Sequence, residues 1–253
     1  MSSDGATGPG RRLRARAVHR VTPDAVGQRV SIRHLVVTGH GTLPQATDVV
    51  GRLLGYEDGV LALIDRRGQL ALVDEAAIVA SRVIPPHPRL PPEPADVGTT
   101  EHPLARDAAR VLLLDAADRV LLVAHRASPT RTVWTAPGGG LRPDEDHLTA
   151  ARRELTEELG LVAEVGPQVW HRDVTFTYAG VHLAQRERWF LARVEAWDPV
   201  TAPLDDPGLI DVRWWTHAEL EATDAVVAPR TLADHLLTLL RDGAPSAPVD
   251  VGR

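Results

Sequence analysis

The sequence predicts an α/β protein in which a small all-β part precedes a larger part that mixes strands and helices. Three observations lead to this fold class. Five short β-type segments crowd residues 26–84, a proline-dense stretch follows at 85–104, and the rest of the chain mixes apolar strands with three helical segments. This order is typical of an all-β domain joined to an α/β domain.

The composition is that of a globular chain and removes several kinds of chemistry. The chain has 253 residues, enough for one large or two modest domains, and a net charge of −6. It has no cysteine and its 28 basic residues are all arginines, which excludes disulfides, thiolate catalysis and lysine nucleophiles. No apolar run approaches about 18 residues and no secretory pattern is visible, so we expect a cytoplasmic protein without a membrane segment.

The front part, residues 21–85, is expected to be a small closed β-barrel. Its strands are predicted within residues 26–37, 47–57, 59–65, 69–74 and 76–84, separated by glycine-containing turns. The pattern in "DVVGRLLGYEDGVLALIDRRGQLALVDEAAIVASRVIPP" resembles the SH3-like small barrel that precedes the catalytic domain of some bacterial acetyltransferases. Such barrels often bind peptides or nucleic acid, but a domain that only packs, dimerises or stabilises fits at least as well.

Three segments are expected to lack regular structure. Residues 1–20 are an arginine-rich arm, residues 86–104 a semi-rigid proline-rich linker, and residues 242–253 a disordered tail. The arginines at 11, 12, 14 and 16 can attract phosphates, but without interleaved aromatic residues a solvated arm is the favoured interpretation. Nucleic acid is therefore not expected as a partner.

The back part, residues 105–241, is predicted to begin with a β-hairpin and to end with two helices. Residues 109–126 read as two apolar strands around a polar turn, and "TVWTAPGGGL" leads from the next strand into a glycine loop. Extended segments follow near 169–180, 181–197 and 210–216. A capping box of Thr216 and Glu219 then predicts one helix, and four periodic leucines predict another near 231–241.

The stretch "RRELTEELG", Arg152 to Gly160, carries three glutamates on one side of a predicted helix. Spacings of three and four residues bring Glu154, Glu157 and Glu158 together, where like charges repel by a few tenths of a kcal/mol per pair. Taken alone, such a stretch is most often a solvated surface. Its apolar stripe consists of Leu148, Ala151, Leu155 and Leu159. The glutamates therefore border a core, and Gly160 is placed to cap the helix in the left-handed conformation.

The residues around this helix resemble the Nudix box. Gly139 is followed after five residues by Glu145, and after seven more by "RELTEELGL", residues 153–161, without a departure from the family's pattern. The resemblance implies an α/β/α sandwich with a mixed sheet. It also implies a pyrophosphohydrolase that cleaves a nucleoside diphosphate linked to another moiety, such as a nucleotide, a dinucleoside polyphosphate or a nucleotide sugar.

Clustered carboxylates without soft ligands favour a hard divalent cation, Mg²⁺ first and Mn²⁺ second. The resemblance implies that Glu154, Glu157 and Glu158 hold the metal. Zinc is not expected, because the 11 histidines show no paired ligand spacing. The resemblance also implies that the glycine loop contacts the substrate through Gly138, Gly139 and Gly140, and that Gly139 lends a carbonyl to the metal.

Other residues are assigned supporting or open roles. Arg153 is interpreted as orienting the glutamates through charge-assisted hydrogen bonds, and Glu145 as supporting the loop or the metal's waters. The general base is left open between a box glutamate and an outside acid, Glu187 in "QRERWF", although a strand glutamate between arginines is usually a surface ion pair. Trp134 and Tyr178 are candidates to stack on a base, although strand aromatics more often belong to a core.

The substrate and two rival functions stay open. Tyr178 lies close to where diadenosine-polyphosphate hydrolases of the family carry a tyrosine, whereas the motifs of ADP-ribose and NADH hydrolases are missing. One rival is a Nudix-fold sensor that binds a ligand without turnover, against which the intact glutamates argue. The other is isomerisation of an isoprenoid diphosphate, which would want a cysteine. A homodimer is compatible with the family, but no residue demonstrates it.

Overall fold

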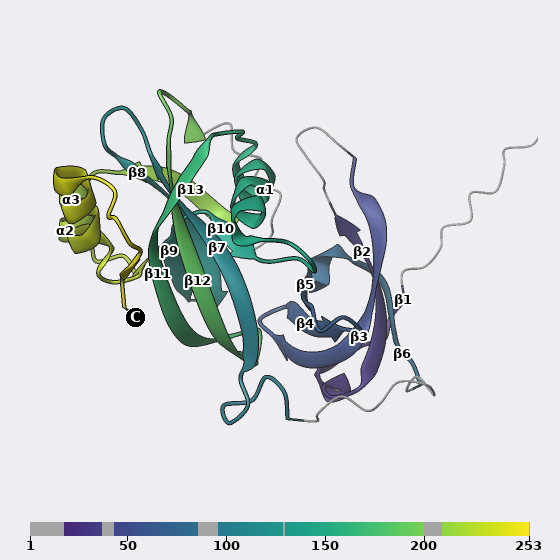
Figure 1. The fold of residues 1–253 in the computed structure, drawn as a ribbon. Helices are drawn as coiled ribbons and strands as arrows, with labels where there is room; N and C mark the ends of the chain where they lie inside the picture. Colours follow the sequence, from purple (N-terminus) through teal and green to yellow (C-terminus); the bar gives the residue numbers. More distant parts are fainter. Residues whose placement is uncertain (1–17, 37–42, 86–95, 129, 200–208, 253) are drawn as a thin grey trace, which may run out of the picture.

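The computed structural model describes residues 18–36, 43–85, 96–128, 130–199 and 209–252, and it contains two β-sheets (Figure 1). The first sheet holds β1 (Val18–His19), β2 (Arg29–Val36), β3 (Gln45–Glu57), β4 (Val60–Asp65), β5 (Leu70–Asp74) and β6 (Ile78–Val83). Short 3₁₀ helices, η1 (Pro23–Ala25) and η2 (Glu75–Ala77), precede β2 and β6. The five strands predicted for the front part are confirmed as β2 to β6.

The front sheet has the order β1-β6-β2-β3-β4-β5, and its neighbours are antiparallel except for the parallel pair β1–β6. One face is apolar because alternate residues such as Val30, Ile32 and Leu53 are fully buried. The described pairings end at β1 and β5 without joining them, so they do not close the predicted barrel. Two residues of the predicted arm form β1; residues 1–17 lie outside the described part.

The second sheet is larger and mixed. It holds β7 (Leu104–Leu114), β8 (Val120–Ser128), β9 (Arg131–Thr135), β10 (Gly138–Gly140), β11 (Val165–Tyr178), β12 (Val181–Arg193), β13 (Leu209–Trp215), β14 (Val227–Ala228) and β15 (Val249–Asp250). The main order is β14-β9-β8-β7-β12-β11-β15, with β10 paired to β7 and β13 to β8. The β7–β12 pair is parallel over eleven residues of each strand.

The predicted hairpin of the back part is only partly present. Strands β7 and β8 pair at Leu114 and Val120, next to the turn, and at no other described position. They then separate because β7 pairs with β10 and β12, whereas β8 pairs with β9 and β13. This separation places the glycine strand β10 beside the middle of β7.

Helices cover both faces of the second sheet, which confirms the α/β/α arrangement (Figure 1). Helix α1 (His147–Leu159) packs on one face, where Leu155 and Leu159 are buried with Val111 and Leu113 of β7. Helices α2 (His217–Ala222) and α3 (Leu232–Asp242) pack on the other face around Trp189. No helix in the described part of the chain is long and apolar enough to cross a membrane.

The ends of the helices follow the sequence signals. Asp146 caps α1 by accepting a hydrogen bond from the Thr149 amide, and Gly160 ends it with a φ of 63°. That positive φ suits glycine because it has no Cβ to clash. Thr216 and Glu219 form the predicted capping box of α2.

The last segment corrects the prediction of a disordered tail at 242–253. Strand β15 adds to the edge of the sheet beside β11, and Val251 is fully buried in the core under α3. The Thr231 hydroxyl donates a 2.6 Å hydrogen bond to the Val251 carbonyl. The polar composition of this segment predicted disorder, although Val251 within it packs into the core.

The two parts are packed against each other through the turn between β11 and β12. Ala62 of β4 shares an apolar cluster with Val181 and Leu183 of β12. Gly55 of β3 lies against the Ala179 carbonyl so closely that a Cβ at this position would overlap it. The linker contributes too, because the Gly98 carbonyl accepts a 2.7 Å hydrogen bond from the His182 amide.

Candidate functional site

The predicted site lies where α1 faces the glycine strand β10. Arg153, in the middle of α1, is the centre of its hydrogen-bond network. Its guanidinium donates to both carboxylate oxygens of Glu145 at 2.8 and 2.9 Å, to Glu154 at 2.7 Å and to Glu157 at 2.8 Å. A further bond of 3.0 Å reaches the Gly140 carbonyl. These are the charge-assisted hydrogen bonds expected of Arg153, and they tie three acids and the β10 backbone together.

Glu154 is held against the backbone of the loop. A Cβ on Gly139 would lie 2.6 Å from the nearer Glu154 carboxylate oxygen, so a larger residue at this position would push the carboxylate aside. Burial raises the pKa of Glu154, and Arg153 opposes the rise. A cation beside Glu154 would therefore stabilise its charged form.

The other two helix glutamates have different environments. Glu158 is buried and accepts a 2.8 Å hydrogen bond from the Gly138 amide, which fixes the start of β10 to α1. Glu157 is exposed, and Arg142 and Arg153 bind its two oxygens at 2.7 and 2.8 Å. Glu145 accepts from the Arg142 amide at 2.8 Å and thus supports the loop.

The three glutamates fit a hard divalent cation by chemistry, but a metal would require a rearrangement. Their donors are all oxygens, which Mg²⁺ and Mn²⁺ prefer. In the described part of the chain, no three histidine, aspartate or glutamate side chains are already arranged around a common point for a metal. Arg142 is the exposed partner of Glu157, so its departure would free one carboxylate oxygen at little cost.

Two arginines of β7 belong to this region and were missed by sequence reasoning. Arg110 donates hydrogen bonds of 3.2 and 2.7 Å to the carbonyls of Ala136 and Gly138. Arg106 lies over Gly140, where a Cβ would overlap its guanidinium. Among the described residues, no hydrogen bond or ion pair holds the Arg106 guanidinium. Burial and the neighbouring Arg110 lower its pKa, while Glu154 opposes this. The spacing of four residues between arginines 106 and 110, which puts both on one face of a largely apolar strand, was the available signal.

Glu187 is buried among hydrogen-bond donors, which argues against its candidate role as a general base. Its side chain is 1% exposed and accepts hydrogen bonds from Arg172, Gln185 and Trp189. Burial alone would raise the pKa of Glu187, but Arg110 and Arg172 outweigh it and lower the pKa to about 2. A carboxylate with several bound donors and such a low pKa is a weak proton acceptor.

The whole of this arrangement lies within a segment that known proteins share. The NUDIX domain family model matches residues 104–236, which is more than half of the chain. The chain belongs to the Nudix family. This assignment agrees with the box motif and with the α/β/α fold.

Individual relatives match parts of the Nudix domain. The m7GpppN-mRNA hydrolase NUDT17 of Bos taurus is 32% identical over 117 residues, covering 42% of this chain and 39% of that protein. The RNA pyrophosphohydrolase of Acidiphilium cryptum is 32% identical over 120 residues, covering 43% of this chain and 73% of that protein. This chain thus spans about two fifths of the length of the cattle relative.

Among solved structures, the MutT protein of Methanosarcina mazei has a TM-score of 0.45 and 19% identity, covering 58% of this chain and 100% of that chain. A C. elegans Ap4A hydrolase complex has a TM-score of 0.42 and 20% identity, covering 54% of this chain and 98% of that chain.

The two aromatic residues proposed to stack on a base are both engaged in packing. Trp134 is half-buried, and its ring meets Trp215 edge-on at a centroid distance of 5.1 Å. Tyr178 is half-buried beside the apolar cluster between the two parts of the molecule.

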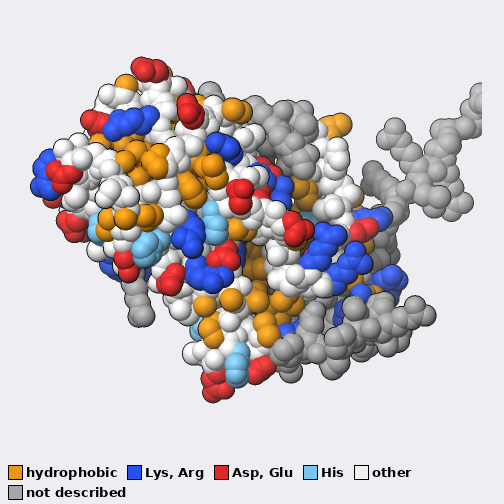
Figure 2. All heavy atoms as spheres, in the orientation of Figure 1, with side chains coloured by type: hydrophobic (Ala, Val, Ile, Leu, Met, Phe, Trp, Pro, Cys, Tyr) orange, Lys and Arg blue, Asp and Glu red, His pale blue; other side chains and the backbone are white. Residues whose placement is uncertain are grey.

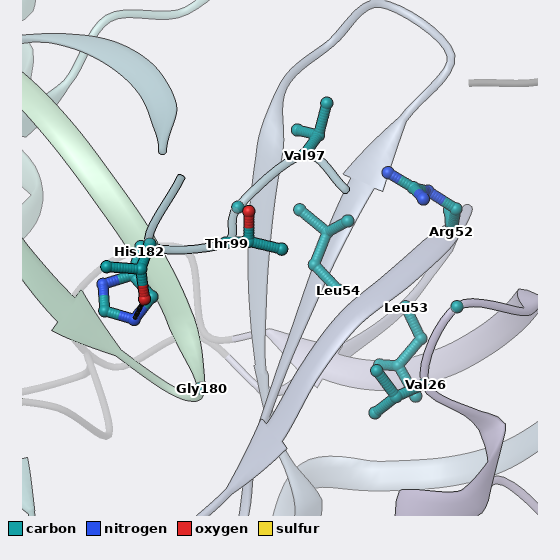
Figure 3. Close-up of a pocket in the computed structure, with 11 residues that line it drawn as sticks. Val26, Arg52, Leu53, Leu54, Val97, Thr99, Gly180 and His182 are labelled. Atoms are coloured by element: carbon teal, nitrogen blue, oxygen red, sulfur yellow. Dashed lines mark hydrogen bonds between the residues drawn. The ribbon is translucent and has the colours of Figure 1, made fainter. Parts of the chain in front are cut away.

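A cavity of ≈ 310 Å³ lies away from the Nudix glutamates, at the junction of the two parts (Figure 3). Arg52, Leu54, Thr99 and His182 are among the residues that line it. Both ring nitrogens of His182 are engaged, by the hydroxyls of Thr100 at 2.9 Å and Thr177 at 3.0 Å. The cavity therefore belongs to the contact between the parts and contains none of the predicted site residues.

Proposed function

We propose that this Nudix protein hydrolyses a phosphoanhydride bond in a nucleoside diphosphate linked to another moiety. The observation that carries the proposal is the Arg153 network, which fixes Glu145, Glu154 and Glu157 beside the backbone of β10. The clustered glutamates repel one another, and a surface helix without a ligand would have no reason to keep them together. The network holds three carboxylates close to the glycine strand, where a cation that binds them could also meet a polyphosphate.

We propose Mg²⁺, with Mn²⁺ as a substitute, as the cofactor held by Glu154, Glu157, Glu158 and the Gly139 carbonyl. When bound, such a cation would neutralise the charge on the phosphates. Glu154 supports this assignment, because burial raises its pKa and an adjacent positive charge would offset that penalty.

The chain's own residues supply the rest of the mechanism. A water attacks phosphorus and the bridging P–O bond breaks, so the leaving phosphate takes the bond's electrons. We assign the proton of this water to a box glutamate, because Glu187 is buried and already bound by several donors. Arg106 is placed to bind a phosphate oxygen, because its guanidinium lies over Gly140 and holds no carboxylate.

Relatives narrow the class of substrate. We propose that 5′-polyphosphorylated RNA is among the substrates, because the relatives at 32% identity are named RNA pyrophosphohydrolase and m7GpppN-mRNA hydrolase. This proposal departs from the expectation, made from the arginine-rich arm alone, that nucleic acid is not a partner.

We also propose that the front sheet is an SH3-like domain joined to the Nudix domain by residues 86–104. Its support is the five-stranded antiparallel order β6-β2-β3-β4-β5 and a core of its own, which includes Val30, Leu61 and Val73. A separate apolar core is what defines a domain.

Chromatographic separation of the hydrolysis products tests the proposed activity. The substrates would be nucleoside triphosphates, dinucleoside polyphosphates, nucleotide sugars and 5′-triphosphorylated RNA, each with Mg²⁺ and with Mn²⁺. We expect turnover by the native chain and a loss of at least about 100-fold in Glu157→Gln. The matched control is Glu164→Gln, an exposed glutamate just beyond α1, which should retain activity. Ligand binding without turnover of any compound would overturn the proposal and favour a Nudix-fold sensor.

A further inference from the structure

The front sheet gathers arginines on the face that is turned away from its core. In β2, Val30 and Ile32 are fully buried, so Arg29 and Arg33 point to the opposite side. The strand pairing then identifies their neighbours, because residues directly opposite each other in a ladder share a face. Arg52 of β3 is opposite Arg29, and Arg82 of β6 is opposite Ser31.

A fifth arginine extends this set. The Arg20 amide, just after β1, donates a 3.3 Å hydrogen bond to the Ser81 carbonyl, which places Arg20 beside Arg82. Val21 is fully buried, so Arg20 points outward. We call Arg20, Arg29, Arg33, Arg52 and Arg82 the arginine face. Arg20, Arg33 and Arg82 are exposed, and Arg29 and Arg52 are half-buried.

The described strands that build this face carry more arginines than carboxylates on it. One carboxylate of the described strands lies among the five arginines, Asp48, and Arg33 binds it with two hydrogen bonds of 2.9 and 2.7 Å. Arg29 and Arg52 stand directly opposite each other, which destabilises a β-ladder. The whole chain has a net charge of −6, so the face is a local exception. Blue side chains gather over the part of the molecule that holds β1, β2, β3 and β6 (Figure 2).

The dimensions of the face suit a chain of phosphates. Arg29 and Arg33 are four residues apart on one strand, about 13 Å, and the four strands span about 14 Å across. A face of this size is several times longer than the rise per nucleotide of a nucleic-acid strand, about 3.4 Å along a duplex axis, so it can contact more than one phosphate at once. Arginine is the side chain best shaped for phosphate, because its planar guanidinium can donate two parallel hydrogen bonds.

We propose that the arginine face binds the phosphate backbone of RNA. The choice of RNA rests on the proposed function, in which the Nudix site acts on an RNA 5′ end. The described residues between the arginines are Ser31, Asp48, Val50 and Ala80, none of them aromatic. Binding therefore relies on phosphates instead of base stacking, and it is independent of sequence and strongly dependent on salt.

Fluorescence anisotropy with a labelled 20-nucleotide RNA of mixed sequence tests the proposal without any turnover. The binding constant would be measured between low and physiological salt for the native chain and for the triple variant Arg20→Gln, Arg29→Gln, Arg82→Gln. We expect the triple variant to bind at least about 10-fold more weakly, and the slope of log K against log salt to fall by about two. A control triple variant, Arg193→Gln, Arg230→Gln, Arg241→Gln, removes the same charge from the Nudix domain and should bind as the native chain does.

A variant that binds RNA more tightly is also needed, because a misfolded variant could lose binding but could not gain it. Asp48→Asn removes the carboxylate that occupies Arg33, so it should bind RNA more tightly than the native chain does. No RNA binding by the native chain, or equal losses in the two triple variants, would overturn the proposal. Single-stranded DNA should bind with similar affinity, because only phosphates are contacted. Tighter binding of DNA than of RNA would refute the choice of RNA, and binding to phosphatidylserine vesicles in place of RNA would assign the face to a membrane.

The binding assay and the hydrolysis assay can fail separately. The arginine-face triple variant should hydrolyse the best small nucleotide at the native rate, because none of its three residues belongs to the Nudix site. RNA binding by a chain without turnover would retain the arginine face and reject the proposed activity. Turnover without RNA binding would retain the proposed activity and reject RNA binding by the arginine face.

Discussion

Glu187 and Arg172 lie directly opposite each other on β12 and β11, and their side chains form an ion pair inside the protein. A charged pair of this kind stabilises the fold only while both partners are present. This ion pair explains why Glu187 serves the stability of the fold.

Glu187→Gln should therefore affect stability more than chemistry. We expect the free energy of unfolding at pH 7 to fall by about 3–5 kcal/mol, because Arg172 would keep a buried charge without its partner. Urea denaturation measures this loss. A variant as stable as the native chain but without hydrolysis would contradict it and restore Glu187 as the base.

The same pair predicts a dependence on acid. The pKa of Glu187 is lowered from its ordinary value of 4.5 to about 2 in the fold. Between these values the unfolded chain binds a proton that the folded chain does not, so stability is present above 4.5 and is lost as the pH falls toward 2. The stability difference between the native chain and Glu187→Gln should narrow over that window in denaturation measured at successive pH values.

His125 predicts a second loss of stability in acid, at a higher pH than that of Glu187. Its Nε2 atom is buried with no hydrogen-bond partner among the described residues. Burial and nearby Arg110 lower the pKa of His125 from 6.5 to about 4. The unfolded chain therefore takes up a proton first, and stability falls by up to about 1.4 kcal/mol per pH unit as the pH drops from 6.5 to 4. In His125→Gln this part of the pH dependence should disappear; an unchanged stability profile would show that His125 does not titrate in this window.

Arg153 is predicted to be a positioning residue for the helix acids. Arg153→Met should lower activity by about 10- to 100-fold and raise the Mg²⁺ concentration needed for half-maximal activity, since three carboxylates lose their donor. Arg153→Lys should recover part of the metal affinity, because it keeps the charge but not the fork of donors. Metal titration of activity, with circular dichroism as the folding control, separates this role from a purely structural one. An unchanged metal requirement in both variants would speak against it.

Substitution of Val251 tests whether the C-terminal segment packs into the core. Val251→Ala should lower the free energy of unfolding by about 1–3 kcal/mol, because the removed methyl groups are fully buried under α3. Val249→Ala is the matched control: its side chain is 39% exposed, so its effect should stay within about 0.5 kcal/mol. Equal effects of the two substitutions would mean that the C-terminal segment is not part of the core.

The sequence by itself determined the elements whose signals are local. The apolar stripe and the caps of α1 lie within the fifteen residues from Asp146 to Gly160, and Gly139 and Arg153, which contact its glutamates, belong to the box motif. The five front strands and the capping box at Thr216 were likewise readable, because alternation and capping depend on neighbours along the chain.

Only the tertiary structure decided what depends on pairing between distant segments. Glu187 is structural because it is buried and pairs with arginines of two other strands. The polar C-terminal segment forms an edge strand because it pairs with β11 and buries Val251. The arginine face also has no local signal, since its five residues come from β1, β2, β3 and β6 and their surroundings. Strand register assembles them, because a one-residue shift in pairing would turn a strand's side chains to the other face.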